Sequence, residues 1–454
     1  MSRSFDAIVI GGGQAGPFLA ARLAGAGQQV ALIERRHMGG TCVNDGCQPT
    51  KTLVASARVA WLARRAQDFG VVTGPVSVDM AAVKARKEKV VLASRQGLDD
   101  WMNSTPNLTV LRGSAAFLSP HAVEVNGEVL EGKQFFLNTG ARPVVPEWAA
   151  GVPYLTNTSI LELDTLPRHL LIVGGSYIGL EFAQMYRRFG SEVTVLARST
   201  RLAAKEDDDV TEAIRGILEG EGIQVITDAR CMAAEQRDDG VAVHYRAGSE
   251  VVEGSHLLLA VGRVPNVEDL RLELAGVRLD DKGYIAVDDT LRTSQPHIYA
   301  LGDVNGRGAF THTSYNDFEI VSQNLLDGAD RKVSERVPAY ALYIDPPLGR
   351  AGMSEAEVRA SGRKALVAVR PMTRVSRANE RAENLGFMKV FADAETRQIL
   401  GVALLGIEGD EVMQSLLEAM AAGVDVDTII RTMHVHPTVS ELVPTLLADL
   451  QPLN

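Results

Sequence analysis

Two copies of one pattern, an apolar strand that runs into a glycine-rich turn and then a helix, constrain the fold of this chain most strongly. In the first copy, residues 5–10 are apolar and β-branched, residues 11–16 form the turn, and an Ala- and Leu-rich helix runs to about Gly25. The second copy starts about 160 residues later, with a strand at His169–Val173 and a turn at residues 174–179. This order predicts a βαβ unit, and two distant copies predict two α/β domains.

The C-terminal third of the chain follows a different pattern. Apolar strands are expected at residues 365–369, 387–391 and Ile399–Leu405, ahead of helices that begin near Glu411 and Val426. With 454 residues, the chain is too long for a single hydrophobic core. We therefore expect an α/β protein with two Rossmann-like dinucleotide-binding domains and an α+β C-terminal domain.

The first glycine turn has the spacing G-x-G-x-x-G, with glycines at Gly11, Gly13 and Gly16. Such a turn lets the backbone approach a pyrophosphate at a helix N-terminus, where unpaired N–H groups attract anions. An acidic residue, Glu34, ends the next expected strand, where it would accept hydrogen bonds from an adenosine ribose. The alternative is an ordinary βαβ turn followed by a surface glutamate.

The second turn departs from this spacing, because Ser176 replaces its middle glycine. An NAD site usually has an acid at the end of the next strand, for the ribose 2′-hydroxyl. Residues 196–201 contain no acid but two arginines, Arg198 and Arg201. A guanidinium can hold a 2′-phosphate through two hydrogen bonds, so the pattern favours NADPH over NADH. The alternative is a pair of solvated arginines.

The chain has three cysteines, and two of them, Cys42 and Cys47, lie in the segment 39–51. Two thiols this close can alternate between dithiol and disulfide, with one attacking a substrate while the other lies against a flavin. A zinc site is the competing interpretation, but zinc needs four ligands and the sequence has no second cysteine pair. The remote Cys231 is expected to be an inert thiol.

Composition narrows the class of protein further. The formal net charge of -11 disfavours general nucleic-acid binding, because phosphates need a basic surface. No apolar stretch is long enough to span a bilayer, and the N-terminus lacks the features of a signal peptide. We therefore expect a cytoplasmic protein that does not bind membranes or nucleic acid.

The cysteine segment, Gly-Gly-Thr-Cys-x-Asn-x-Gly-Cys-x-Pro-Thr-Lys, resembles the signature of the class I pyridine nucleotide–disulfide oxidoreductases. That family includes glutathione reductase, dihydrolipoamide dehydrogenase and mercuric reductase. The resemblance covers essentially the whole chain and implies FAD and NADPH as cofactors. It implies that Cys42 is the interchange thiol that faces the substrate and that Cys47 is the charge-transfer thiol beside the flavin. Lys51 and Glu181 are similar to the ion pair near flavin N5.

The same resemblance implies further cofactor contacts. Tyr177 resembles the gate that moves aside for the nicotinamide, and Asp303 resembles the acid that binds the ribitol of FAD. His312 is either a polar contact near the flavin or only a residue in the first turn of a helix. The other expected contacts are Gly40, Thr41, Ala115, Gly140, Gly175, Ser176, Ile178, Gly262, Gly302 and Thr311.

Near the C-terminus, His436 and Glu441 resemble the His-Pro…Glu motif of the disulfide-reducing members. An imidazole can carry a proton to and from the interchange thiol, and the glutamate would fix the tautomer of the imidazole. In the family this histidine reaches the dithiol of the other subunit, so the resemblance implies a homodimer. The alternative is a His-Pro surface turn.

The resemblance also implies domain boundaries. We expect a discontinuous FAD-binding domain at residues 1–148 and 263–336, and an NADPH-binding domain at residues 149–262. The α+β domain at residues 337–454 would then be the dimerisation domain.

Two residues of the cysteine segment depart from the family pattern. Asp45 stands where many members carry an apolar residue, and Gln48 replaces a small apolar residue. A carboxylate that points at the cysteines would disfavour a thiolate, whereas one that points to solvent would have little effect.

We predict an NADPH-dependent reductase of a low-molecular-weight or protein disulfide, with no resident metal ion. One alternative is a mercuric-reductase-like enzyme that reduces metal ions or small electrophiles, because residues 195–200 are similar to the NADPH segment of mercuric reductase. The tail at residues 449–454 has no vicinal cysteine pair, and no metal-binding domain precedes Phe5, which argues against mercury. Another alternative is a flavoprotein that serves only as a binding or scaffold subunit.

Overall fold

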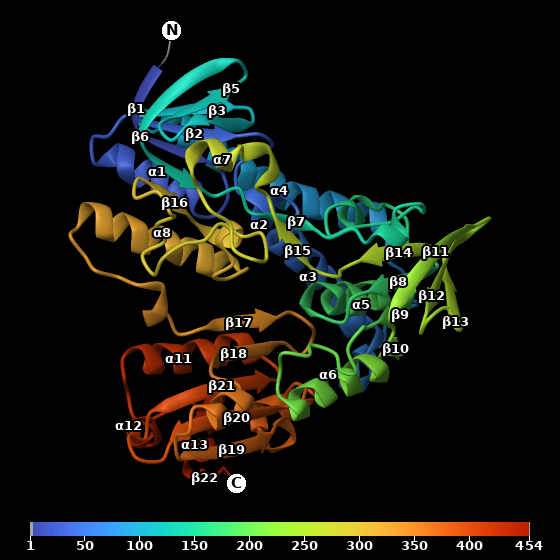
Figure 1. Cartoon of the computed structure of the whole chain (residues 1–454). Helices are drawn as coiled ribbons and strands as arrows, with labels where there is room; N and C mark the ends of the chain where they lie inside the picture. The colour runs from blue at the N-terminus through green and yellow to red at the C-terminus, as the bar shows by residue number, and fades with distance from the viewer. Residues whose placement is uncertain (1–2, 454) are drawn as a thin grey trace.

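The computed structural model describes residues 3–453. Within that range the strands form five sheets, of seven, four, three, two and six strands. In Figure 1 the N-terminal sheet lies at the top, the second α/β unit lies on the right, and the C-terminal sheet lies at the bottom. The arrangement agrees with the predicted α/β class and its separate α+β C-terminal region.

The N-terminal sheet comprises β1 (Arg3–Ile10), β2 (Val30–Glu34), β3 (Leu108–Arg112), β4 (Ala115–Ser119), β5 (Ala122–Val125), β6 (Glu128–Leu137) and β16 (Ile298–Ala300). Its order is β3-β2-β1-β6-β5-β4, with β16 also paired to β6. β1 and β2 are mostly apolar and buried, as expected for parallel strands covered on both faces. Helices α1 (Gly16–Gly25) and α8 (Thr311–Leu326) share one buried cluster with these strands and cover one face.

The second parallel sheet has the order β10-β9-β8-β14. It comprises β8 (His169–Val173), β9 (Glu192–Leu196), β10 (Gln224–Ile226) and β14 (His256–Leu259), with helices α5 (Tyr177–Phe189) and α6 (Asp208–Gly220). An antiparallel meander of β11 (Cys231–Arg237), β12 (Gly240–Tyr245) and β13 (Glu250–Gly254) precedes β14. β14 ends at Leu259, and the chain turns at Gly262, where φ is 130°.

A short antiparallel pair joins the two parallel sheets. β7 (Ala141–Pro143) leads away from the N-terminal sheet, and β15 (Arg263–Pro265) leads back to it. Figure 1 shows both strands between the upper and right-hand parts of the molecule. The chain therefore enters and leaves the second sheet through this pair of strands, and the glycine turns at the two crossings, Gly140 and Gly262, lie at opposite ends of the pair.

Three helices connect the first turn to the rest of the molecule. They are α2 (Gly40–Asn44), α3 (Cys47–Arg64) and the long α4 (Met80–Ser104). Helix α3 packs against both α4 and α5, so the cysteine segment at its start is held between the two α/β units. A shorter helix, α7 (Leu272–Ala275), packs against β4.

The C-terminal sheet is antiparallel, in the order β17-β18-β21-β20-β19-β22. Its strands are β17 (Ala339–Leu342), β18 (Leu348–Gly352), β19 (Ala365–Pro371), β20 (Phe387–Asp393), β21 (Ile399–Leu405) and β22 (Gln451–Pro452). Its helices are α9 (Glu355–Ala360), α10 (Ser376–Glu380), α11 (Gly409–Ala421), α12 (Val426–Arg431) and α13 (Val443–Ala448). β17 is one of the two edge strands, and it faces the other two units (Figure 1).

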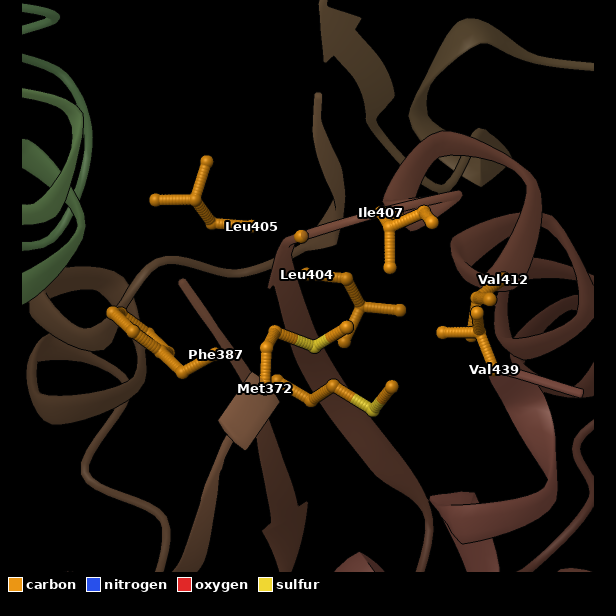
Figure 2. Close-up of a pocket in the computed structure, with 10 residues that line it drawn as sticks. Met372, Phe387, Leu404, Leu405, Ile407, Val412 and Val439 are labelled. Atoms are coloured by element: carbon orange, nitrogen blue, oxygen red, sulfur yellow. The ribbon is translucent and has the colours of Figure 1, made fainter. Parts of the chain in front are cut away.

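An apolar pocket lies inside this C-terminal unit, between the sheet and helix α11. Figure 2 shows its lining, which includes Met372, Phe387, Leu404, Val412 and Val439. It contains no charged or hydrogen-bonding side chain, so it is part of the core and not a candidate site. Among the described residues, no helix is both long and apolar enough to cross a membrane.

Candidate functional site

The cysteine segment is packed directly against the first glycine turn. Gly39 and Gly40 have φ values of 93° and 57°, in the left-handed region that favours glycine. A Cβ on Gly40 would lie 2.8 Å from Cα of Gly13. The backbone N–H of Gly39 also donates to the carbonyl of Gly12 at 2.7 Å. Only glycine at these positions lets the cysteine-bearing helices approach the dinucleotide-type turn so closely.

The two thiols lie on either side of a break between two helices. Cys42 is in α2, and Cys47 is the first residue of α3, where unpaired backbone N–H groups favour negative charge. Both are free thiols, and Cys47 Sγ lies 3.2 Å from Thr311 Oγ1, at the start of α8. This arrangement brings α2, α3 and α8 together around one sulfur atom.

The two cysteines have opposite pKa shifts. The hydrogen bond from Cys42 lowers the pKa of Cys47 to about 6; the Thr311 hydroxyl and the Lys51 charge act in the same direction, against burial. The same bond to Cys47, together with burial, raises the pKa of Cys42 well above the usual thiol range. At neutral pH, Cys47 is therefore the thiolate and Cys42 is its proton-bearing donor.

Lys51 is one helical turn after Cys47 and forms an ion pair with Glu181 of α5. Its Nζ lies 2.7 Å from Glu181 Oε2 and 3.0 Å from Oε1. The backbone N–H of Tyr343 donates to the same carboxylate at 2.9 Å, and the Tyr343 ring lies 4.7 Å from Lys51 Nζ. The Glu181 carboxylate is nearly fully buried, so this pair is fixed by three separate segments of the chain.

The first glycine turn is packed so closely that two of its positions have no room for a side chain. A Cβ on Gly11 would lie 2.2 Å from the Asn138 carbonyl oxygen, and one on Gly16 would lie 2.0 Å from the Gly11 oxygen. The buried Glu34 carboxylate accepts from Gly12 N at 2.7 Å and so stays beside the turn. Asn138, which the sequence analysis missed, accepts from Gly16 N at 3.1 Å.

A second polar group lies where β16 ends. Gly302 has a φ of 74°, and Asp303 follows it. Burial raises the pKa of Asp303, which Arg263 partly offsets. Arg263 Nε is buried and lies 3.6 Å from Asp303 Oδ2, too far for a hydrogen bond, and it has no other acceptor among residues 3–453. Arg263, which the sequence analysis did not single out, also lies 3.5 Å from Thr41 Oγ1.

These groups fit an elongated ligand that carries hydroxyl and phosphate groups. Arg263 forms an ion pair with Asp303 at 3.6 Å, but its buried Nε has no hydrogen-bond acceptor among residues 3–453 and so can donate to a ligand. Gly140 and Gly262 have positive φ values and face open space, with no atom within 4 Å of an added Cβ. Ala115 begins β4 close to Glu34, since Gly113 N donates to the Glu34 carbonyl at 3.1 Å.

His312 is placed differently from its neighbour Thr311. Its Nε2 lies 2.6 Å from the carbonyl oxygen of Ala339 in β17, and its ring stacks on Phe310 at 5.4 Å. Desolvation holds the pKa of His312 below its usual range. The imidazole therefore links α8 to the C-terminal sheet, which leaves the helix-terminal backbone as the part of His312 that can meet a ligand.

The second glycine turn has the same tight geometry as the first. A Cβ on Gly174 would lie 2.2 Å from the Ala260 oxygen, and one on Gly175 would lie 2.6 Å from Ala197 Cβ. Ser176 precedes α5 without capping it, and it is exposed. Ile178 is an exposed apolar side chain at the same end of the sheet. The turn therefore presents small and apolar groups to a ligand.

The two arginines after β9 are not equivalent. Arg201 forms an ion pair with Asp208, at the start of α6. Arg198 is exposed, and within residues 3–453 it has no hydrogen-bond or ion-pair partner. Arg198 is therefore the guanidinium that is available to an anion.

His436 and Glu441 form a pair at the far end of the molecule. His436 Nδ1 lies 2.7 Å from Glu441 Oε2, and the Glu441 side chain is 10% exposed whereas the imidazole is 74% exposed. The preceding Met433 and Val435 are also exposed. Neither member of the pair hydrogen-bonds to Cys42 or Cys47 within the described chain. The arrangement orients an imidazole whose Nε2 points away from its own carboxylate partner.

The two unusual residues of the cysteine segment have defined contacts. Asp45 Oδ2 lies 3.0 Å from Arg36 Nη1, so its charge is paired away from the thiols. Gln48 Nε2 donates to Ser94 at 2.6 Å, while its Oε1 is buried without a partner among the described residues. Burial raises the pKa of Cys231 to about 11, as expected for an inert thiol. No group of three potential metal ligands occurs within residues 3–453.

Comparison with known proteins gives the class. Residues 5–317 match the family model for pyridine nucleotide-disulphide oxidoreductases, and residues 338–447 match the dimerisation domain of the same family. The chain therefore belongs to the pyridine nucleotide-disulphide oxidoreductase family, and it is an oxidoreductase of the flavin-dependent, pyridine-nucleotide-using class I type.

The sequences of several known relatives align with nearly the whole chain. The probable pyridine nucleotide-disulfide oxidoreductase RclA of Escherichia coli (strain K12) is 35% identical, over 96% of this chain and 97% of the relative. A mercuric reductase of Lysinibacillus sphaericus is 32% identical, over 96% and 81%. A dihydrolipoyl dehydrogenase of Chlamydia pneumoniae is 32% identical, over 100% and 99%.

The solved structures give the same family. The HOCl-induced flavoprotein disulfide reductase RclA from Escherichia coli superposes with a TM-score of 0.90, at 34% identity and over 98% of this chain and 99% of that one. A Cu(II) complex of the same enzyme has a TM-score of 0.89, at 33% identity and over 99% of both chains.

Proposed function

We propose that this protein is an NADPH-dependent FAD disulfide oxidoreductase that passes electrons from NADPH through FAD to Cys42 and Cys47, and on to a disulfide substrate. The observation that carries this proposal is the placement of Cys47 at the start of α3, 3.2 Å from Thr311 Oγ1 and one helical turn before Lys51. A Cys47 pKa of about 6 gives a stable thiolate, and Cys42 is its hydrogen-bond donor. Such a pair is suited to thiol–disulfide exchange.

FAD, when bound, would supply the two-electron step between a nicotinamide and a disulfide. The turn at Gly11, Gly13 and Gly16, with Glu34, would hold its adenosine end. Asp303 and Arg263 would meet the ribitol and phosphates, as the unsatisfied Nε of Arg263 beside Asp303 supports. The remaining proposed contacts are Gly40, Thr41, Ala115, Gly140, Gly302, Thr311 and the backbone of His312. In this proposal residues 1–148 and 263–336 form the FAD-binding domain.

Residues 149–262 would bind NADPH. The free, exposed Arg198 supports a coenzyme that carries a 2′-phosphate. Gly175, Ser176, Ile178 and Gly262 would line the rest of the path, and Tyr177 would act as the gate. Arg201 contributes less than Arg198 in this proposal, because Asp208 already pairs with it.

The proposed exchange at sulfur has two steps. Cys42 loses its proton, and its thiolate attacks one sulfur of the substrate disulfide, which forms a mixed disulfide and releases the first thiol with that proton. The Cys47 thiolate then attacks Cys42 Sγ, which releases the second thiol and closes the Cys42–Cys47 disulfide. The hydride of NADPH returns two electrons, so one NADPH and one proton convert one disulfide into two thiols. Lys51, held by Glu181, stabilises the Cys47 thiolate until it closes the disulfide.

The proton would come from His436 of the partner subunit in a homodimer. Three features support this: the match of residues 338–447 to a dimerisation domain, the exposure of His436, and its hydrogen bond to Glu441. Residues 337–454 would then form the dimerisation domain. The predicted cytoplasmic location would suit a thiol pair that works in its reduced form.

A second candidate substrate is a metal ion. The Cu(II) complex of the related RclA and the mercuric reductases among the relatives favour it. Two thiols bind soft metal ions readily, so the same Cys42–Cys47 pair would receive the ion. A purely binding or scaffold role would leave the ionised Cys47 without a use.

One experiment tests the dithiol mechanism: NADPH oxidation by wild type, Cys42→Ser and Cys231→Ser with oxidised glutathione, lipoamide, other disulfides, Cu(II) and Hg(II). We expect Cys42→Ser to bind flavin and accept electrons from NADPH but to lose turnover, whereas Cys231→Ser behaves like wild type. Full activity of Cys42→Ser with every acceptor would contradict the proposal. The acceptor that wild type prefers decides between the disulfide and metal-ion candidates.

A further inference from the structure

The side chain of Tyr177 is tied to a buried carboxylate. Its hydroxyl donates to Glu206 Oε1 at 2.8 Å. Glu206 lies in the loop between β9 and α6, and its side chain is fully buried. The same loop is hydrogen-bonded to the glycine turn, because Ala203 N donates to the Gly175 oxygen at 2.7 Å. The proposed gate and its carboxylate partner therefore form one local unit.

The same carboxylate oxygen has a second phenol donor. The Tyr340 hydroxyl donates to Glu206 Oε1 at 2.6 Å, and Tyr340 belongs to β17 of the C-terminal sheet. The rings of Tyr177 and Tyr340 are 5.5 Å apart. Tyr340 itself is fixed, because its ring stacks on Phe310 at 5.3 Å with planes 4° apart. One oxygen thus joins a residue of the second α/β unit to a residue of the C-terminal unit.

The other oxygen of Glu206 has only a distant cation. Glu206 Oε2 is buried and has no hydrogen-bond donor among residues 3–453, and Arg350 Nε lies 3.8 Å away. Arg350 is also engaged by Asp207, at 3.1 Å. A buried carboxylate with so few donors depends strongly on each phenol that remains.

We propose that Glu206 is a positioning residue that latches Tyr177 in its resting place through the oxygen shared with Tyr340, and so sets the affinity for the nicotinamide end of the coenzyme. The inference rests on the proposed function, because it takes Tyr177 as the gate. When the Tyr177 ring moves aside, Glu206 loses one donor and keeps Tyr340. The latch therefore opposes opening, and Tyr340 makes opening less costly.

This arrangement predicts that Glu206→Gln and Tyr340→Phe change the affinity for the nicotinamide in opposite directions. Glu206→Gln weakens the latch, because a neutral amide oxygen is a poorer acceptor than a carboxylate, and Tyr177→Phe removes the donor. Both variants populate the open state more and should bind the nicotinamide more tightly, by about fivefold. Tyr340→Phe leaves the buried Glu206 side chain with no phenol donor once the gate opens, so this variant should bind the nicotinamide several times more weakly.

The test is an equilibrium titration of the FAD-loaded protein with two ligands. Tetrahydro-NADPH carries a nicotinamide-type ring but cannot donate a hydride, and 2′-phospho-ADP-ribose lacks the ring. We expect the three variants to change the dissociation constant of the first ligand in the directions given and to leave that of the second unchanged. The double variant Tyr177→Phe/Tyr340→Phe should match Tyr177→Phe alone, because a phenylalanine gate has no bond to Glu206 to break.

Tyr186→Phe is the matched control. Tyr186 lies on the same helix as Tyr177 and does not touch Glu206. The variant loses one buried hydrogen bond, which the hydroxyl donates to the Ile160 oxygen at 3.0 Å. It should leave both dissociation constants unchanged. Equal shifts for both ligands, or shifts of the same sign in Glu206→Gln and Tyr340→Phe, would overturn the latch alone. A wild-type protein that binds neither ligand would overturn the proposed function as well.

Discussion

Cys47 Sγ lies 3.2 Å from Thr311 Oγ1, so the first residue of helix α3 contacts the first residue of helix α8. Helix N-termini carry partial positive charge, and two of them converge on this sulfur. The contact joins segments 264 residues apart in sequence. It makes the ionisation of Cys47 depend on the tertiary structure and not on the cysteine segment alone.

The first prediction concerns this contact. Thr311→Val removes the hydroxyl but keeps the shape, and we expect the Cys47 pKa to rise from about 6. A hydrogen bond to a charged group contributes about 1.5–3 kcal/mol, so the acid dissociation constant should fall on the order of tenfold or more. The thiolate ultraviolet absorbance of the reduced protein, followed against pH, measures the change. Thr311→Ser should restore the wild-type curve; a curve for Thr311→Val that overlays wild type would contradict the role of the hydroxyl.

The second prediction is the pH dependence of the thiolate itself. A thiol gains its charge when it loses its proton, so a lowered pKa extends the thiolate form downward in pH. We expect the thiolate absorbance of reduced wild type to be present at neutral pH and to disappear as the pH falls through about 6. Cys47→Ser should lack this transition and Cys231→Ser should keep it. A first transition near 9, the ordinary thiol value, would show that the surroundings do not stabilise the thiolate.

The third prediction separates the two arginines after β9. Arg198→Ala should raise the KM for NADPH by on the order of tenfold to a hundredfold and leave the KM for NADH nearly unchanged, because only NADPH carries the 2′-phosphate. Arg201→Ala is the matched control and should change either KM by less than about threefold, since Arg201 is paired with Asp208. Steady-state kinetics with both coenzymes measures this. Equal effects of Arg198→Ala on the KM values for NADPH and NADH would contradict the proposal that Arg198 binds the 2′-phosphate.

The fourth prediction concerns Asp45, which the sequence left unexplained. The structure pairs it with Arg36 at 3.0 Å, and Asn157 Nδ2 holds its backbone oxygen at 2.8 Å. Asp45→Asn should therefore leave the Cys47 pKa unchanged. Arg36→Ala frees the carboxylate and should raise that pKa, because an uncompensated negative charge disfavours a thiolate. Thiolate titration of both variants tests this; an effect of Asp45→Asn as large as that of Arg36→Ala would show that Asp45 acts on the thiols directly.

The elements that the sequence predicted are those determined by residues that are adjacent in the chain. The strand before Gly11 and the helix after Gly16 follow from contiguous residues, and so does the second unit around β8. The contacts of Asn138, Arg263 and Tyr340 were not predictable, because their partners are more than 100 residues away in sequence. Nothing in the residue type of Arg263 distinguishes it from the many surface arginines until the chain folds back at β15.

The last prediction concerns the two-subunit site. If His436 serves the dithiol of the partner subunit, the homodimers of Cys42→Ser and of His436→Ala each have two defective sites. A mixed dimer of the two has one intact site, made of Cys42 from one subunit and His436 from the other. Random assembly from equal amounts makes about half of the dimers mixed, so co-expression should restore about a quarter of wild-type activity. If His436 served its own subunit, every site in the mixed dimer would lack one group, and co-expression would restore nothing.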